Sequence, residues 1–220
     1  MTPSDPTIVP GAKQAFYQRF DERYYTTDGY DDYLTRFEAE AETDIIAPLF
    51  ALIDVQPSWS FLDVGCGMGG TILALRRRGF SAEGTEVSPF CLTASPAKEW
   101  MRFGEASALP YADTSFDVVL CNDMFQYLTR EEIRLAAAEF VRVARQFIVF
   151  SAIHDDSPNA SQQFNPDHLR QSSTPSIGEM RDAFLAAGAR VHKDNAFGWD
   201  FTYSCIFSTQ ATGTAQGLPA

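Results

Sequence analysis

The sequence is short of positive charge. Its 220 residues include 17 lysines and arginines against 29 aspartates and glutamates, which gives a formal net charge of −12. Proteins that bind the phosphate backbone of nucleic acids need a cationic surface, so this composition argues against a nucleic-acid partner. It leaves open a small anionic substrate that is held by local groups.

Long apolar runs are also absent. No stretch approaches the roughly 20 apolar residues that a membrane-spanning helix needs. Residues 1–11 are polar and proline-rich, without the apolar core of a signal peptide. We therefore expect no membrane partner and a soluble, cytoplasmic protein.

The sequence has few metal-binding motifs. None of its four cysteines belongs to a Cys-x-x-Cys pair, so a zinc site is not expected and the thiols are read as reduced and buried. The run His154-Asp155-Asp156 is an alternative divalent-metal site, but adjacent residues rarely converge on one ion. We expect no metal. The cysteines are Cys66, Cys91, Cys121 and Cys205.

The most informative segment is Phe61–Gly70, with the sequence FLDVGCGMGG. Apolar residues lead into Asp63, and glycines then follow at alternate positions. A buried strand that ends in this way predicts a tight turn where a ligand approaches the backbone, because Gly65 and Gly67 lack the Cβ that would block it. A helix that begins near Gly70 would point its N-terminal amide groups at that ligand.

Strands and helices alternate after this turn, which predicts an α/β fold with a mostly parallel, doubly wound sheet. The expected strands are 59–64, 80–87, 116–121, 146–153, 189–198 and 201–208, and the expected helices are 12–25, 34–55, 88–96, 129–143 and 176–188. Only about two residues separate the last two strands, which predicts a hairpin and one antiparallel strand near the edge.

Three domains or segments are expected. Residues 1–55 would form an N-terminal helical cap, residues 56–209 the sheet domain, and residues 210–220 a flexible tail. The first cap helix is rich in aromatic residues, and we interpret it as a lid whose Tyr24 and Tyr25 close over the ligands. Packing of an amphipathic helix on the sheet is the alternative.

Polar residues at the ends of the expected strands sharpen the prediction. Glu86 follows Gly65 by 21 residues, where a carboxylate reaches the ribose hydroxyls of a nucleoside. Gly104-Glu105-Ala106 follows one strand unit later, and Asn122-Asp123 ends the strand that begins at Phe116.

Together these motifs resemble the class I S-adenosylmethionine-dependent methyltransferases in their small-molecule branch, over roughly residues 61–153. The resemblance implies a Rossmann-like seven-stranded sheet with six parallel strands and the last-but-one strand antiparallel. It also implies S-adenosylmethionine as cofactor and a small-molecule methyl acceptor. The cofactor residues that it implies are Asp63, Gly65, Cys66, Gly67, Glu86, Val87, Glu105, Ala106 and Asn122, with Tyr25 added from the lid.

The sequence departs from the family in three places. Glu105 stands where relatives commonly have aspartate, and Phe125-Gln126-Tyr127-Leu128 replaces a glutamate-histidine pair that many relatives carry. An Asp-Pro-Pro-Tyr motif is absent, which disfavours methylation of the exocyclic amines of nucleobases. Phe125, Tyr127, Phe164 and Trp199 are expected to form pocket walls.

The acceptor atom stays open between oxygen, nitrogen and carbon. Methyl transfer from a sulfonium needs a base only where the acceptor must lose a proton. His154 and His168, after the strand 146–153 and in the following loop, are the expected catalytic bases. An NAD-dependent oxidoreductase and a non-catalytic S-adenosylmethionine-binding module are the alternatives, and the protein is expected to be a monomer or homodimer.

Overall fold

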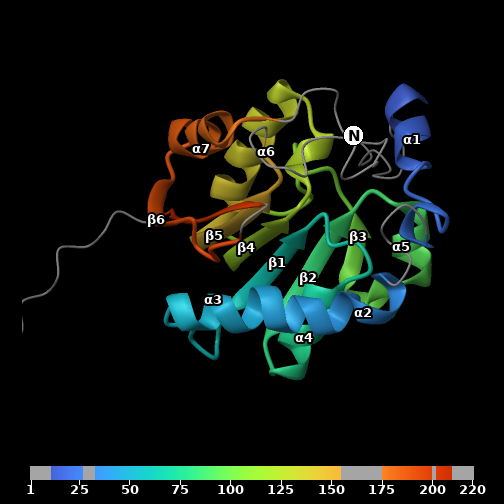
Figure 1. Cartoon of the computed structure of the whole chain (residues 1–220), viewed down its shortest axis with the longest axis horizontal. Helices are drawn as coiled ribbons and strands as arrows, with labels where there is room; N and C mark the ends of the chain where they lie inside the picture. Colours follow the sequence, from blue (N-terminus) through green and yellow to red (C-terminus); the bar gives the residue numbers. More distant parts are fainter. Residues whose placement is uncertain (1–10, 27–32, 155–174, 200–201, 210–220) are drawn as a thin grey trace, which may run out of the picture.

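The structure of the protein is a computed structural model that describes residues 11–26, 33–154, 175–199 and 202–209. Seven strands form one sheet in the order β3-β2-β1-β4-β5-β7-β6, with helices on both faces (Figure 1). The predicted α/β sheet is therefore confirmed. The strands are β1 (Ser60–Val64), β2 (Ser81–Glu86), β3 (Met101–Phe103), β4 (Phe116–Asn122), β5 (Ala144–Ala152), β6 (Arg190–Asp194) and β7 (Tyr203–Ser208).

The strand directions match the resemblance. The pairs β3–β2, β2–β1, β1–β4 and β4–β5 are parallel, whereas β7 is antiparallel to both β5 and β6. The last-but-one strand in space is thus the antiparallel one. Strand β3 has only three residues, and the sequence pattern alone did not delimit it.

The predicted two-residue turn between the last strands is wrong. Strand β6 ends at Asp194, and Asn195 turns the chain with a φ of 43°. The backbone N–H groups of Ala196 and Phe197 then bond to Ser204, at 3.0 and 2.9 Å. Residues 196–198 were predicted as the end of the strand, but Ala196 and Phe197, with Trp199 after them, pack instead as partly buried side chains against the core.

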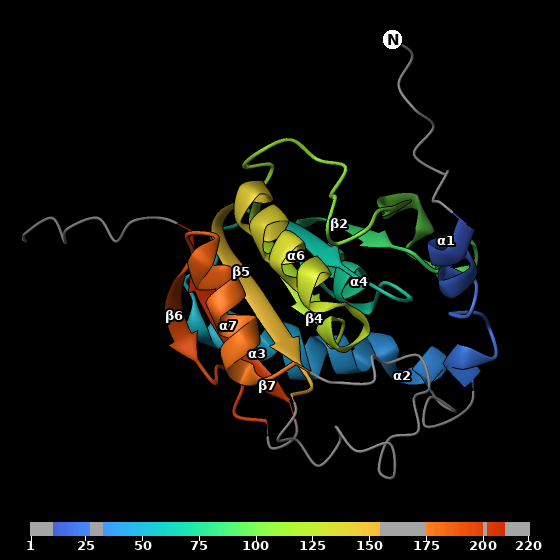
Figure 2. The same ribbon diagram turned by 90° about the horizontal axis from the view of Figure 1, so that it is seen from above.

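Helices cover the two faces of the sheet as separate groups. Helices α2, α3 and α4 lie on one face and α6 and α7 on the other, while α1 lies near the end of the sheet that holds β3 (Figures 1 and 2). The helices are α1 (Gly11–Tyr17), α2 (Tyr33–Glu40), α3 (Ala47–Leu52), α4 (Gly70–Arg77), α5 (Pro89–Ala94), α6 (Arg130–Val143) and α7 (Ile177–Ala186).

Side-chain caps set the starts of three helices. Thr129 and Ser176 each form a capping box with the glutamate three residues later. Ser88 accepts a hydrogen bond from the N–H of Cys91, with Pro89 as the first helical residue. These caps fix the chain direction after the ends of β2 and β4.

The first predicted helix is shorter than expected. Helix α1 ends at Tyr17, and a separate 3₁₀ turn spans Tyr24–Thr26. Aromatic residues have modest helix propensity, and here their rings pack against one another across the break, for example Phe16 on Phe20. Tertiary packing therefore decides the conformation of this segment.

Residues 33–52 form one helical segment, but it contains a π-helical turn at Ala41–Ile46 between α2 and α3. Pro48 lies two residues after this turn and has no N–H to donate to a carbonyl one turn earlier. The change in hydrogen-bond register precedes this proline, so the helix continues with an extra residue in one turn.

The segment belongs to the main core. Ile46 and Leu49 are fully buried in the same cluster as Phe61 of β1 and Ile72 of α4. None of the described helices is both long enough and apolar enough to cross a membrane.

Helix α2 crosses α4 at a glycine. A Cβ on Gly70 would lie 2.4 Å from the carbonyl oxygen of Phe37 in α2, a backbone atom that cannot move aside. We expect Gly70→Ala to lower the free energy of unfolding by about 2 kcal/mol because the two helices must separate. Chemical denaturation measures this change.

Gly178→Ala is the matched control. Gly178 lies in helix α7, and the nearest atom to a new Cβ would be the Ser176 hydroxyl oxygen at 3.8 Å. Alanine has the higher helix propensity, so this variant should unfold at the same denaturant concentration or a higher one. Equal losses of stability in the two variants would contradict the packing argument.

Candidate functional site

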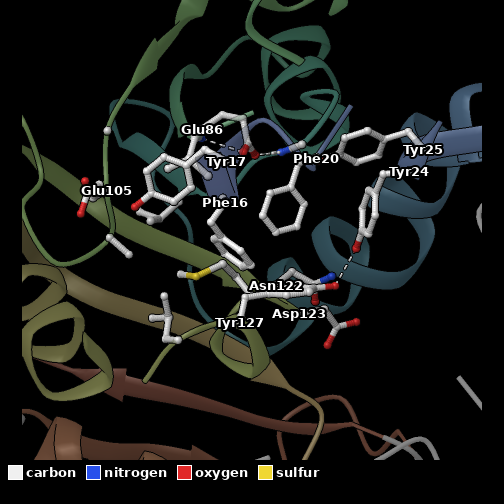
Figure 3. Close-up of a pocket in the computed structure, with 18 of the residues that line it drawn as sticks. Phe16, Tyr17, Phe20, Tyr24, Tyr25, Glu86, Glu105, Asn122, Asp123 and Tyr127 are labelled. Atoms are coloured by element: carbon white, nitrogen blue, oxygen red, sulfur yellow. Dashed lines mark hydrogen bonds between the residues drawn. The ribbon is translucent and has the colours of Figure 1, made fainter. Parts of the chain in front are cut away.

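A large cavity lies at the carboxyl ends of β1, β2 and β4. Its volume is about 580 Å³, within the ~300–1,000 Å³ range of ligand pockets in proteins. Strand ends supply one side and the N-terminal segment supplies the other. Figure 3 shows the side chains, with Glu86 at the top, Glu105 at the left, and Tyr24 and Asp123 at the right. Parallel sheets bind ligands at this edge.

The glycine turn after β1 forms part of the cavity wall. Gly65 and Gly67 have φ angles of 73° and 52°, in the left-handed region that side chains disfavour. A Cβ on Gly67 would lie 2.6 Å from the Tyr33 hydroxyl, and one on Gly65 would lie 2.9 Å from Cγ of Met124. The turn therefore needs glycine both for its backbone angles and for close approach.

Cys66 lies between the two glycines but does not line the cavity. Its side chain is buried in the core and lies close to Gly84 of β2, where a Cβ would come within 2.6 Å of its sulfur. Burial raises the pKa of this thiol. A role of Cys66 in ligand binding would therefore run through its backbone.

Asp63 lies behind the turn, near the end of β1. Its carboxyl group is 5% exposed and hydrogen-bonds Thr71 of α4. Burial, together with the nearby charge of Glu86, raises its pKa to about 7. Asp63 is not one of the residues that line the large cavity.

Glu86 holds the turn and also faces the cavity. One carboxylate oxygen accepts from the N–H of Gly67 at 2.7 Å, and the other accepts from the N–H groups of Val87 and Ser88 at 2.7 and 2.9 Å. Burial raises its pKa even though these three bonds favour the charged form. Val87 lines the cavity beside it.

Glu105 and Ala106 line the cavity beyond the end of β3. The Glu105 carboxylate accepts a hydrogen bond from Lys13 of α1, which also forms an ion pair with Glu132 of α6 at 3.0 Å. These contacts raise the pKa of Lys13 above its usual value, even though burial alone would lower it. The ion pairs connect α1 to the loop after β3 and to α6.

Asn122 and Asp123 line the cavity at the end of β4. The Asn122 side-chain oxygen accepts from the hydroxyl of Ser151 in β5. Asp123 has a φ of 49°, which a residue with a side chain rarely adopts, and its N–H donates to the Ser151 carbonyl at 3.0 Å. The neighbouring strand thus fixes the direction of both residues.

The N-terminal segment covers the cavity with aromatic rings. Tyr25 is 7% exposed and stacks on Tyr33 and Phe90, with ring centroids 5.5 and 5.9 Å apart. Burial raises its pKa well above the usual value. Phe16, Phe20 and Tyr24 also line the cavity. The position of this segment fits the lid that we predict, and closure itself stays a prediction.

The predicted catalytic histidines do not lie among the described residues that line the cavity. His154 follows β5, and its Nδ1 atom is buried and lacks a hydrogen-bond partner within the described residues. His168 lies outside the described residues. The part of the structure that is described holds no group of three or more histidine, cysteine, aspartate or glutamate residues suited to a metal ion.

Of the expected pocket walls, Tyr127 lines the cavity. Phe125 does not, because it is fully buried among the rings of Phe150 and Phe184. Trp199 packs near Phe197 against the core. Phe164 lies outside the described residues.

Sequence reasoning missed several groups of the cavity, among them Lys13, Tyr33, Arg36, Glu40 and Glu132. For Lys13 a signal existed, since it precedes Tyr17 by one helical turn and therefore shares its face. Glu132 also caps helix α6, where its carboxylate accepts a hydrogen bond from the N–H of Thr129.

Comparison with known proteins identifies the domain. A family model described as a methyltransferase domain matches residues 62–147. The ajmaline N-methyltransferase of Rauvolfia serpentina is 30% identical over 124 residues, which cover 50% of this chain and 42% of that protein. The norajmaline N-methyltransferase of the same organism is 28% identical over the same coverage. The chain spans less than half the length of these two curated relatives.

Solved structures show the same fold at low sequence identity. The magnesium protoporphyrin IX methyltransferase of Synechocystis PCC 6803 with bound SAM has a TM-score of 0.62 at 14% identity, over 92% of this chain and 98% of that one. A geranyl diphosphate methyltransferase has a TM-score of 0.57 at 17% identity, over 78% and 77% of the two chains.

The residues at the strand ends fit the cofactor of these enzymes. The turn at Gly65 and Gly67 leaves room where a Cβ would block a ligand, and the Glu86 carboxylate faces the cavity two strands from Asn122. The cavity residues, the matched domain and the shared fold therefore all point to the same cofactor. Residues 62–147 thus match the methyltransferase domain family, and the sheet around them has the fold of a methyltransferase solved with S-adenosylmethionine bound.

Proposed function

We propose that the protein transfers the methyl group of S-adenosylmethionine to a small-molecule acceptor. The observation that carries this proposal is the cavity, in which the glycine turn, Glu86 and the aromatic rings of the N-terminal segment surround one space of about 580 Å³. Rings that cover a cavity exclude water and suit a small organic acceptor better than a polymer.

Each predicted site residue receives a role in this proposal. Gly65 and Gly67, with the backbone of Cys66, would bind the methionine part of the cofactor beside Asp63. The Glu86 carboxylate would accept hydrogen bonds from the ribose hydroxyls. The remaining roles are adenine contacts for Val87, Glu105 and Ala106, a place near the sulfonium for Asn122, and a cover for Tyr25.

When bound, the cofactor supplies an activated methyl group on a positively charged sulfur that leaves as a neutral thioether. The protein's part is to hold the acceptor in line with that group and to keep water out. A hydroxyl acceptor must also lose a proton, and His154 and His168 remain the proposed bases for that case.

Isothermal titration calorimetry with S-adenosylhomocysteine tests the cofactor site, with NAD as the control. We expect micromolar binding of S-adenosylhomocysteine and none of NAD. Transfer of radiolabelled methyl groups to a metabolite extract then tests for catalysis. Cofactor binding without any labelled product would favour the alternative of a non-catalytic binding module.

The cap at residues 1–55, the sheet domain at 56–209 and the tail at 210–220 stay predictions about the division of the chain. The cytoplasmic location and the monomeric or homodimeric state stay predictions as well.

A further inference from the structure

We propose that the methyl acceptor is an apolar amine that binds as an ammonium ion between the aromatic rings and the Asp123 carboxylate. This inference rests on the proposed function and names its substrate class. Three observations support it: the cavity lining is net negative, the basic side chains of the lining form ion pairs with acidic residues, and aromatic rings lie on the Asp123 side of the cavity.

The cavity lining is net negative. It contains five acidic side chains, from Glu40, Glu86, Glu105, Asp123 and Glu132, and two basic ones, from Lys13 and Arg36. A sulfonium cofactor carries one net positive charge, so the lining remains negative beside it. A cationic acceptor is attracted to such a site, and an anionic one is repelled.

Both basic side chains of the lining already have acidic partners. Lys13 pairs with Glu105 and Glu132, and Arg36 of α2 pairs with Glu40 one turn later. A carboxylate or phosphate acceptor would have to displace one of these partners. Among the described lining residues, both positively charged side chains are therefore already paired with carboxylates of the protein.

Three rings of the lining form one cluster on the Asp123 side of the cavity. The Phe20 ring lies 5.1 Å from that of Tyr24 and 5.4 Å from that of Tyr127, both nearly edge-on. The hydroxyls of Tyr24 and Tyr127 hydrogen-bond each other at 2.8 Å. Figure 3 shows Phe20 and Tyr24 on the side of the cavity where Asp123 lies, away from Glu105.

Aromatic faces and a carboxylate attract the same kind of ligand. The face of an aromatic ring carries negative potential and binds cations, and tyrosine does so even when its hydroxyl is paired. Asp123 adds a full negative charge at the end of β4. An alkylammonium group with apolar substituents is attracted to both the ring faces and the Asp123 carboxylate. A neutral alcohol has no positive charge for either of them to attract.

The chemistry of an amine also suits this site. The bound ammonium loses one proton to water, and the nitrogen lone pair then forms the new N–C bond while the C–S bond breaks and its electron pair stays on sulfur. The positive charge leaves sulfur and appears on the methylated nitrogen. Once the ammonium has lost its proton, one positive charge, first on sulfur and then on nitrogen, stays beside the carboxylates of the cavity during the methyl transfer.

Three ligands with one carbon skeleton test the proposal: 2-phenylethylamine, 2-phenylethanol and phenylacetate. Each is titrated calorimetrically into the protein saturated with S-adenosylhomocysteine. We expect the amine to bind at least 10-fold more tightly than the alcohol, and phenylacetate to bind most weakly. Equal or tighter binding of the alcohol or the acid, or no measurable binding of the amine, would overturn the inference.

When the amine titration is repeated in two buffers with different ionisation enthalpies, the difference in heat gives the number of protons exchanged with the buffer on binding. An amine that binds as ammonium at pH 7 exchanges no proton with the buffer, whereas one that binds in its neutral form releases one. A released proton would contradict the ammonium form directly. This readout does not depend on turnover.

Variants assign the preference to the named groups. We expect Asp123→Asn to reduce the preference for amine over alcohol to below 3-fold, and Tyr127→Leu to reduce it similarly, while Tyr127→Phe keeps the ring and the preference. Glu131→Gln is the charge-matched control, because Glu131 is exposed and does not line the cavity. An unchanged preference in Asp123→Asn would remove Asp123 from the proposal.

The binding of S-adenosylhomocysteine separates this inference from the proposed function. Without that binding the proposed function fails first. With it, and with a preference for the alcohol, only the amine inference fails, and His154 becomes the residue to test as a base.

Discussion

Replacing Glu86 with alanine should weaken the binding of S-adenosylhomocysteine by about 100-fold. A carboxylate that accepts from two ribose hydroxyls contributes roughly 1.5 kcal/mol or more through each charge-assisted bond, and about 3 kcal/mol corresponds to this change in affinity. Glu86 also fixes the turn through the N–H groups of Gly67, Val87 and Ser88, so its loss removes ligand contacts and loosens the site together. Calorimetric titration measures the affinity.

Glu83→Ala provides the control on the same strand. Glu83 lies in β2 three residues earlier, is partly exposed, and pairs with Arg102 of β3 at 3.0 Å. It does not line the cavity. We expect its replacement to change the affinity by less than twofold, since exposed ion pairs contribute little. Thermal unfolding of both variants shows whether they remain folded, and an affinity for Glu86→Ala close to that of the original protein would refute the ribose assignment.

Asp63 should make the protein less stable as the pH rises from 4 to 7. Folding raises its pKa from 3.8 to about 7, so in this window the unfolded chain loses the proton and the folded protein keeps it. The stability that the protonated group contributes is complete below pH 4 and is lost by pH 7. At ~1.4 kcal/mol per pKa unit, the loss amounts to about 4 kcal/mol.

Asp63→Asn resembles the protonated form at every pH. The free energy of unfolding of this variant, relative to the original protein, should therefore grow between pH 4 and pH 7 and then level off. Chemical denaturation at a series of pH values gives this difference. A constant difference, or one that shrinks with pH, would show that the folded protein does not hold Asp63 in its neutral form.

Asp117→Asn should give the opposite slope. Burial alone would raise the pKa of Asp117, but the Arg145 side chain, at 2.6 Å, and the Ser60 N–H, at 2.9 Å, lower it. Its folded pKa lies below the unfolded value, so the stability it contributes is present above the unfolded pKa and is lost as the pH falls. The pH dependence of the unfolding free energy in the Asp63→Asn and Asp117→Asn variants should therefore differ in sign, so each variant is a control for the other.

Local sequence predicted the elements that local chemistry controls. The capping boxes at Thr129 and Ser176, the glycine turn and the buried strands β1, β2, β4 and β5 depend on residues close in sequence. The link between β6 and β7 and the π-helical turn before Pro48 depend on packing against distant elements. These were the places where the predictions were wrong or incomplete.

The candidate site shows the same division. Strand-end residues such as Glu86, Glu105 and Asn122 follow from topology, because parallel strands bring their carboxyl ends to one edge. Lys13 is held at the cavity by its contacts with Glu105, 92 residues away, and with Glu132 of α6. No motif within the N-terminal segment predicts a contact with a residue so distant in sequence. The wall of the cavity that this segment forms could therefore be identified only in the structure.

The cavity has two walls that differ in stiffness. One is formed by the continuous helical segment 33–52 and the other by α1. Arg36 and Glu40 line the cavity from the same helical segment whose other end, at Ile46 and Leu49, is locked into the core. To move that wall would disrupt the core, so its opening free energy approaches that of global unfolding. The described contacts of the α1 wall are ring contacts, such as Tyr17 on Phe103, and the ion pairs of Lys13, so we expect this wall to open at a lower free energy. We therefore expect ligands to pass in and out on the α1 side, and amide hydrogen exchange there to be the fastest around the cavity.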